Sequence, residues 1–369
     1  MKKLIAALFS LMLILALPVQ AFAAEEKLTL PSEKDHLPYY YTLLSKDEQA
    51  DYLKLRKAVI NHDKRIEFTA SEVTESFLRK AQRIMLEYDS YTFDIDEIST
   101  MSSGYETNGK YRASKYELTF KYLMSKENYM RAVAYADKKV QKFLAEIPED
   151  MSSTQKLLAA HDFIIEECVY DLEYENGYTA YAAIVYGRAL CEGYAKAFQY
   201  ICEEFGIPCV IAVGMSPNSD NGHAWNKVKV GKNWYNIDVT NDDTDDNFYG
   251  YISKNYFFLA DSEYSLANEI FYDELEEPVA SDTEHSYYEM TGQSFATADE
   301  AITYMKGKLQ KDLPVTVVVA LGSNIEYNKF ALKYFDEACT TPAVKKYREV
   351  HSYIVNYDKT LTYMIHFYS

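Results

Sequence analysis

The sequence contains little cysteine, only five residues among 369. An odd number at irregular spacings argues against a dense disulfide framework and leaves at least one thiol free in any monomer. No two cysteines form a CxxC pair, which argues against a structural zinc site. With 48% hydrophobic residues, the chain can instead bury a packed core. The five are Cys168, Cys191, Cys202, Cys209 and Cys339.

Positive charge is also scarce, with 38 Lys and Arg against 56 Asp and Glu, a formal net charge of −18. Such a chain repels nucleic acid and anionic lipid surfaces, so we expect neither as a partner. Cationic substrates, lysine-bearing peptides and divalent ions would be attracted. The acidic run 242–246 lacks the Gly and final Glu of an EF-hand loop. We interpret it as a solvated acidic loop, with a calcium site as the alternative.

Long apolar runs are limited to residues 4–17, which follow Lys2 and Lys3 and precede Ala21-Phe22-Ala23. This pattern predicts a secretory signal peptide over residues 1–23, cleaved before Ala24. The run is short for a spanning helix of about 20 residues, and an uncleaved anchor is the alternative. We therefore expect a secreted protein without a membrane contact after cleavage. Association with the cell surface stays open.

The length predicts two or three domains, at roughly 100–200 residues per domain. Residues 24–150 combine helical patterns with a hairpin, residues 151–270 a helix with an antiparallel meander, and residues 282–369 a small α+β module. The expected fold class is α+β throughout. The chain shows no internal repeat or low-complexity segment.

Several local signals place the elements of the N-terminal region. Ser45 with Glu48 is a capping box for a helix ending near Asn61, and Thr69 with Glu72 predicts a second helix running to Tyr88. Asn-Gly at 108–109 predicts a hairpin turn. Further elements are expected as helices over 125–146 and 154–170 and a strand over 116–122.

The later elements are also predicted from local patterns. We expect a helix over 191–205, ended by Gly206, and then strands over 209–213, 223–230 and 233–239. The C-terminal module is expected to contain a helix over 299–310, a strand over 315–321, a helical piece to about residue 350 and a hairpin over 353–368.

Cys191 stands where the chain enters a helix, close to the free backbone N–H groups of its first turn. Those groups and the helix dipole favour a nucleophilic thiolate. The small residues Gly193 and Ala195 would leave the sulfur approachable. Position alone leaves a plain packing role as an equal alternative. The cysteines on apolar faces, Cys168, Cys202 and Cys209, are interpreted as small hydrophobic residues.

His223 and Asp238 lie on successive predicted strands and can meet across them. A carboxylate beside an imidazole fixes its tautomer and stabilises its protonated form, which is the third role of a catalytic triad. Trp225 shares the sheet face of His223 and could shield the ring, and it is also a candidate cleft residue. A lone histidine is more often structural. A metal site using Cys191 and His223 is a poor alternative, because no further ligand arrives at suitable spacing.

Three segments together resemble the transglutaminase-like family: Leu-Cys-Glu-Gly-Tyr-Ala at 190–195, Gly-His-Ala-Trp-Asn at 222–226 and Tyr-Asn-Ile-Asp-Val-Thr at 235–240. The lead-in Tyr-Thr-Ala-Tyr-Ala at 178–182 is similar as well. The resemblance covers about residues 150–265. It implies a papain-like core, a helix packed on an antiparallel sheet, that needs no cofactor.

The resemblance also implies roles for individual residues. Cys191 would be the nucleophile, His223 the base and acid, and Asp238 the residue that orients the imidazole. The backbone N–H of Cys191 would help to hold the oxyanion, with Tyr181 as a candidate second donor. Family members often carry Trp soon after the Asp-Val-Thr segment, whereas this chain has Asn241, which puts the shape of the adjacent cleft in doubt.

These inferences predict an extracellular thiol acyl-transfer enzyme that hydrolyses a peptide or amide bond through a thioester, resembling cysteine peptidases. Its partner would be a peptide or protein substrate, with a cell-wall substrate as one option. Protein cross-linking is an alternative, as is a catalytically silent surface protein that binds or scaffolds. Residues 24–110 precede the catalytic module, which suggests an inhibitory segment covering the cleft.

Overall fold

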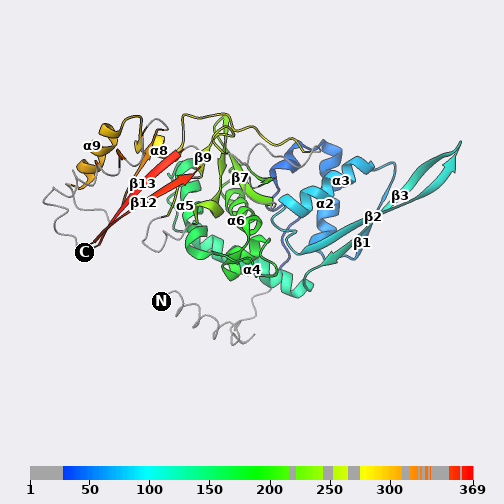
Figure 1. Cartoon of the computed structure of the whole chain (residues 1–369). Coiled ribbons are helices and arrows are strands. Elements are labelled where there is room, and N and C mark those ends of the chain that lie inside the picture. The colour runs from blue at the N-terminus through cyan, green and yellow to red at the C-terminus, as the bar shows by residue number, and fades with distance from the viewer. Residues whose placement is uncertain are drawn as a thin grey trace.

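The computed structural model describes residues 28–215, 222–243, 252–264, 275–309, 316–322, 325, 329–330, 333, 349–357 and 360–368. The predicted signal peptide, Cys339 and residues 244–246 of the acidic run lie outside these ranges. Figure 1 shows the elements along the chain. In the described part, no helix is both long and apolar enough to cross a membrane.

The central unit is a helix on an antiparallel sheet, which confirms the predicted α+β papain-like fold class. Helix α6 (Cys191–Glu204) contacts the sheet, whose strand order is β6-β7-β8-β9. Gly206 adopts a φ of 66° and ends the helix, as predicted. The strands are β6 (Cys209–Met215), β7 (Gly222–Val230), β8 (Asn233–Ile237) and β9 (Phe257–Leu259).

The described N-terminal region contains four helical pieces and one strand before the hairpin. Ser45 and Glu48 form the predicted capping box, with reciprocal hydrogen bonds of 3.3 and 2.9 Å, at the start of α2. The elements are η2 (Tyr39–Leu43), α2 (Lys46–Ile60), β1 (Arg65–Thr69), α3 (Glu75–Arg83) and η3 (Ile84–Tyr88).

The helix predicted to start at Thr69 starts five residues later. Thr69 ends β1 and pairs with Lys115, so its backbone belongs to a sheet. Glu72 still bonds the Thr69 N–H at 2.7 Å, but this closes a turn. The helix cap is Thr74, whose hydroxyl accepts from the Phe77 N–H at 3.1 Å. Long-range strand pairing has overridden a local capping pattern.

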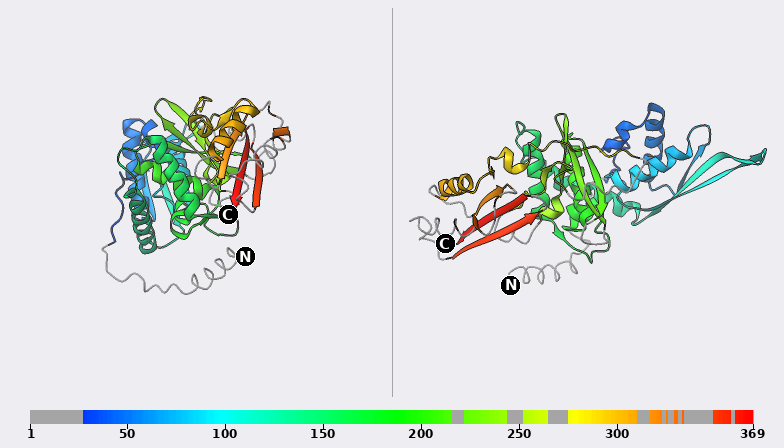
Figure 2. Two further views of the ribbon diagram at one scale, coloured as in Figure 1. Left: turned by 90° about the vertical axis from the view of Figure 1, so that its left-hand side faces the viewer. Right: turned by 45° about the horizontal axis from the view of Figure 1, so that its top comes forward.

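A long hairpin follows, formed by β2 (Ile95–Thr107) and β3 (Lys110–Tyr122). Its turn lies at Asn108 and Gly109, with φ of 54° and 70°, as the Asn-Gly pair predicts. Only the base packs on the body, through Leu118 and its neighbours on β3. The distal half is exposed, and Figures 1 and 2 show it projecting away from the molecule.

The hydrophobic core does not divide at residue 150. One buried cluster joins α4 (Lys126–Leu144) and α5 (Ser153–Glu167) with α6 and the sheet. A second joins α2, α3 and β3 with Ala195 of α6, Ile211 of β6 and Ala224 of β7. The region 28–144 and the central unit therefore share their interior.

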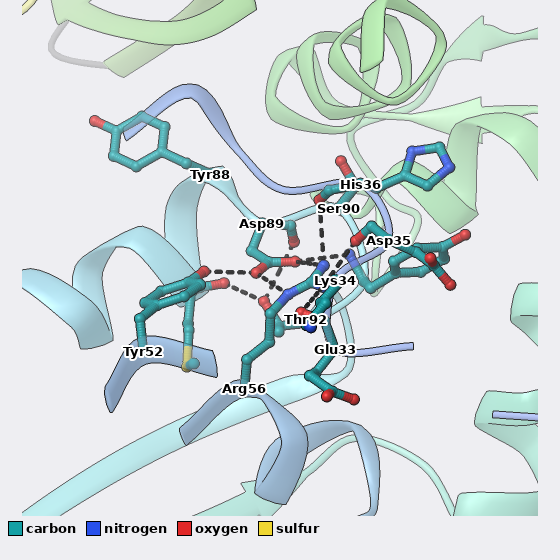
Figure 3. A network of polar contacts seen from close by, with 12 residues as sticks. Glu33, Lys34, Asp35, His36, Tyr52, Arg56, Tyr88, Asp89, Ser90 and Thr92 are labelled. Atoms are coloured by element: carbon teal, nitrogen blue, oxygen red, sulfur yellow. Dashed lines mark hydrogen bonds and ion pairs between the residues drawn. The ribbon is translucent and has the colours of Figure 1, made fainter. Parts of the chain in front are cut away.

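A buried ion pair fastens the start of the described chain to this body (Figure 3). The Arg56 side chain is fully buried and contacts both oxygens of Asp89, at 2.6 and 2.8 Å. Its remaining N–H groups donate to the backbone carbonyls of Glu33, Asp35 and His36. Residues 33–36, which we call the N-terminal strap, are thereby held in place.

The C-terminal module forms a separate four-stranded sheet of order β10-β11-β13-β12. The predicted closing hairpin is confirmed, but β12 begins at Glu349, so no helix continues to residue 350. Most of the segment predicted as that helix lies outside the described residues. The elements are α8 (Tyr287–Met290), β10 (Ser294–Phe295), α9 (Ala298–Leu309), β11 (Thr316–Leu321), β12 (Glu349–Tyr357) and β13 (Thr360–Tyr368).

Candidate active site

Cys191 is the first residue of α6 and is half-buried. Leu190 precedes it at the N-cap and has no side-chain acceptor, so no capping side chain occupies the N–H groups of the first turn. An anion formed beside the sulfur could therefore accept hydrogen bonds from this helix end. The thiol lies at the position where the helix can assist charge development.

The other described cysteines are buried, which makes them poor nucleophiles. Burial raises the pKa of the Cys168 thiol to about 12. Burial also raises the pKa of Cys202 well above its ordinary value. Cys209 lies within the sheet with a side chain that is only 3% exposed. Cys191 is the most accessible of these four thiols.

His223 lies on β7 and turns its Nε2 toward the Asp238 carboxylate, with 2.7 Å between Nε2 and Oδ2. Burial of the ring lowers its pKa, but the Asp238 charge and hydrogen bond outweigh this, and Cys191 adds to them. The net effect raises the pKa of His223 to about 10. The ring is thus protonated at neutral pH, and its Nδ1 is not used by Asp238.

Asp238 is fully buried and held by several donors. It follows β8 and caps the short helix α7 (Val239–Asp242), accepting the Asn241 N–H at 3.0 Å. The Asn241 side-chain amide and the Tyr264 hydroxyl each donate to Oδ2 at 2.6 Å. Burial raises the pKa of Asp238, but the His223 charge and these hydrogen bonds lower it below its ordinary value. Asn241 thus supports the carboxylate directly.

Trp225 lies on the same sheet face as His223, with the two rings nearly parallel and 6.2 Å apart. Its indole N–H donates to Asn236 at 2.8 Å, and its ring meets the edge of Tyr264 at 4.9 Å. Trp225 is 1% exposed. It therefore shields and positions the imidazole and is not a surface of the cleft.

Tyr181, the candidate second oxyanion donor, contacts other aromatic residues. Its hydroxyl donates to the Tyr186 hydroxyl at 3.1 Å, and its ring stacks on Phe93 at 5.5 Å. In this arrangement the Tyr181 proton is already committed to another oxygen. Its role as an oxyanion donor has no support in these contacts.

Tyr170 lies near the candidate triad, at a position that the sequence did not reveal. The predicted helix through Tyr170 ends at Glu167, and β4 (Val169–Tyr170) pairs in parallel with β5 (Arg188–Ala189), just before Cys191. Burial raises the pKa of Tyr170, and the negative charges of Cys191 and Asp238 raise it further. Its ring lies 6.3 Å from that of Tyr194 on α6. Tyr170 therefore borders the thiol and the carboxylate.

Gly193 and Ala195 are small because of packing, not to expose the sulfur. A Cβ on Gly193 would lie 2.2 Å from the Gly177 carbonyl oxygen and 2.8 Å from the Ala189 methyl. Ala195 is buried in the core, and its carbonyl accepts from Asn226 at 2.9 Å. The expected role of these residues is wrong, since both face neighbouring elements.

We expect Gly193→Ala to lower the free energy of unfolding by about 1–3 kcal/mol, because backbone atoms must move to admit the methyl group. The shift should displace the first turn of α6 and reduce the rate of Cys191 alkylation. Urea denaturation and alkylation kinetics would measure the two effects. Gly307→Ala is the matched control, since a Cβ there meets nothing within 4 Å. Equal changes in stability and in alkylation rate in the two variants would contradict the packing argument.

The acidic run is not a solvated loop at its start. Asp242 is fully buried, contacts His161 Nε2 at 3.1 Å and accepts from the Ser253 hydroxyl at 2.6 Å. Asp243 accepts from the Tyr194 hydroxyl at 2.6 Å. Both carboxylates thus tie α7 to its neighbours. Within the described ranges, no three His, Cys, Asp or Glu side chains are grouped so that they could hold a metal ion.

Comparison with known proteins identifies the domain. Residues 141–239 match the transglutaminase-like superfamily. No curated protein matches the chain.

Similar solved structures include a candidate cysteine protease from Cytophaga hutchinsonii, at 16% identity over 40% of this chain with a TM-score of 0.26. A TGase is 19% identical over 57% of this chain, with a TM-score of 0.29. The periplasmic domain of TgpA from Pseudomonas aeruginosa is 16% identical over 39%, with a TM-score of 0.22. The matches cover 65%, 62% and 65% of those chains, respectively.

The family match spans the start of α6, the strand β7 that carries His223, and Asp238 directly after β8, and the helix-on-sheet architecture agrees with it. Residues 141–239 of this chain thus form a domain that matches the transglutaminase-like superfamily.

Proposed function

We propose that the protein is a thiol acyl-transfer enzyme that hydrolyses a peptide or amide bond. The observation that supports this most is the 2.7 Å contact between His223 and Asp238, made by a ring that also interacts with Cys191 at the start of α6. A nucleophile, a base beside it and a group that orients the base are the parts this chemistry needs. A surface protein that only binds has no need of this combination.

In the first half-reaction, the Cys191 sulfur adds to the carbonyl carbon of the substrate and forms a C–S bond. The carbonyl oxygen gains the negative charge, which the N–H groups of the first turn of α6 stabilise. His223 then gives its proton to the departing nitrogen, and the C–N bond breaks. A thioester on Cys191 and a free amine or ammonia result.

In the second half-reaction, neutral His223 takes a proton from water, whose oxygen attacks the thioester carbonyl. The C–S bond breaks, the carboxylic acid leaves, and the sulfur and imidazole return to their starting state. Asp238 keeps Nε2 protonated throughout, so Nδ1 carries out the proton transfers. A lysine amine entering in place of water would give a cross-link.

We place this reaction outside the cytoplasm, on the basis of the signal-peptide pattern at the N-terminus. The substrate class is a peptide or protein, with cell-wall peptides included. The inhibitory role suggested for residues 24–110 stays a prediction, and the described part of this region contributes to the core around α6. Removing it would disrupt folding, whether or not it covers the site.

Alkylation by iodoacetamide, resolved by cysteine with mass spectrometry across about pH 4–9, tests the proposal. We expect rapid reaction of Cys191 at about pH 5–6, where an ordinary thiol with a pKa near 8.5 is protonated and slow. His223→Ala should remove that reactivity at low pH. The buried Cys202 is an internal control in the same sample. If Cys191 is inert, or reacts identically in both proteins, the triad is not functional and a binding role becomes the better reading.

A further inference from the structure

Exposed apolar side chains gather on the segment that leads to Cys191. Leu172 is 78% exposed and Val169 is 56% exposed, high values for side chains of this kind. Tyr170 and Tyr186 in the same segment are also exposed. Contiguous exposed apolar groups mark interaction sites more often than isolated ones do. This segment borders the candidate nucleophile, so its partner would reach the thiol.

Within the residues that the structure describes, the backbone of the same segment pairs with a strand on one side only. The N–H groups of Val169 and Asp171 donate to Gly187 and Ala189 on the β5 side. In a parallel pair, the residue between them directs its N–H and C=O to the other side, so those of Tyr170 face outward. In the described part of the chain, β4 and β5 form a sheet of two strands, and no third strand covers this edge.

The charge around this edge is negative. Between residues 171 and 192, four carboxylates stand against a single cation, Arg188. Arg188 is itself paired with Asp171. Glu173 and Glu175 are exposed beside Leu172. A ligand that meets this edge gains from carrying positive charge.

We propose that the outer edge of β4 binds the substrate as an added strand, and that the substrate is an extended, cationic peptide segment with an apolar side chain. This inference rests on the proposed function of Cys191. Main-chain hydrogen bonds to Tyr170 would give affinity, and the apolar group would pack on Val169 or Leu172. Lysine or arginine in the same segment would meet the carboxylates.

The placement of β4 brings such a strand to the nucleophile. Tyr170 pairs with Ala189, two residues before Cys191, which corresponds to roughly 7 Å along a strand. Neighbouring strands lie about 4.8 Å apart, so a peptide on the outer edge lies about 9.6 Å from β5, on the far side of β4. A peptide on the outer edge therefore needs to extend by only a few residues to present a carbonyl to the sulfur.

Tripeptidyl acyloxymethyl ketones, which alkylate thiols, test the proposal on the full mature chain. One probe carries Leu and Lys, a second Leu and Glu, and a third Ser and Lys. We expect the first to alkylate Cys191 at least about tenfold faster than either other probe, as expected when one apolar side chain or one charge contact is lost. A further set consists of variants of the first probe, each methylated at one backbone nitrogen. The variant methylated at the nitrogen that bonds Tyr170 should alkylate Cys191 more slowly than the others.

Leu172→Ser should remove most of the preference for Leu over Ser while leaving alkylation by iodoacetamide unchanged. Met101→Ser is the matched control, since Met101 is 68% exposed on the distant β2–β3 hairpin. Equal rates for all probes, or no effect of Leu172→Ser and of N-methylation, would overturn the proposed docking edge. If Cys191 still reacts with iodoacetamide in that case, the proposed function stands. If Cys191 reacts with none of the reagents, both the docking edge and the proposed function are overturned.

Discussion

Replacement of Asp238 by Asn is expected to reduce turnover by on the order of 10²–10⁴-fold, as loss of the orienting carboxylate does in comparable triads. The neutral amide cannot stabilise imidazolium, and its NH₂ group can present the wrong hydrogen to Nε2. After burial, which opposes it, the Asp238 charge is the main cause of the raised pKa of His223. That pKa should therefore fall from about 10 toward or below 6.5.

The pKa is measurable without a substrate, by NMR titration of the His223 ring. Because the folded-state pKa exceeds the ordinary value of 6.5, the protonated ring stabilises the fold. This contribution is complete below pH 6.5 and is lost as the pH rises toward 10. Asp282→Asn is the matched control, because Asp282 also accepts from a tyrosine hydroxyl, that of Tyr235 at 2.8 Å, without contacting His223. An unchanged titration in Asp238→Asn would refute the assigned role.

Arg56→Met is expected to lower the free energy of unfolding by about 3–5 kcal/mol, the usual cost of leaving one member of a buried ion pair without its partner. The Asp89 carboxylate would stay buried, with only the Tyr52 hydroxyl and the Tyr91 N–H as donors. The three carbonyls of the N-terminal strap would also lose their hydrogen bonds. Chemical denaturation at neutral pH measures the change.

Two further variants make this prediction specific. Arg65→Met removes an exposed pair with Glu117 and should change stability by less than about 1 kcal/mol. Arg56→Lys keeps the charge but loses the fork geometry, so an intermediate loss is expected. If Arg56→Met behaves like Arg65→Met, the buried network does not hold the strap.

Sequence reasoning succeeded where short patterns decide the structure. Gly206 ends α6, Ser45 caps α2, and Asn108 with Gly109 turns the hairpin, because each signal acts within a few residues. The meander placed His223 on β7 and Asp238 near the end of β8, but β8 ends at Ile237, and Asp238 caps α7 where the prediction continued the strand to residue 239. The roles of these residues came from the resemblance to the family motifs, because local physical arguments alone could not assign them.

The failures share a dependence on distant contacts. Thr69 has a capping pattern, but its pairing with Lys115 decides its structure. Tyr170 belongs to a two-residue strand whose partner lies 19 residues later, too short for any periodic signal. Tyr264 bonds Asp238 from 26 residues downstream. With 35 tyrosines in the chain, nothing in the sequence distinguishes Tyr170 or Tyr264 from the rest.

The shared interior determines which piece of this protein can exist alone. A fragment that begins where the family match begins, at residue 141, would present Ala195, Ile211 and Ala224 to water, although all three are buried in the whole chain. It would also lose His36, which contacts Glu204 at the end of α6 at 2.8 Å. The smallest unit that keeps this interior intact therefore starts at the N-terminal strap, and the region before residue 141 contributes to its scaffold.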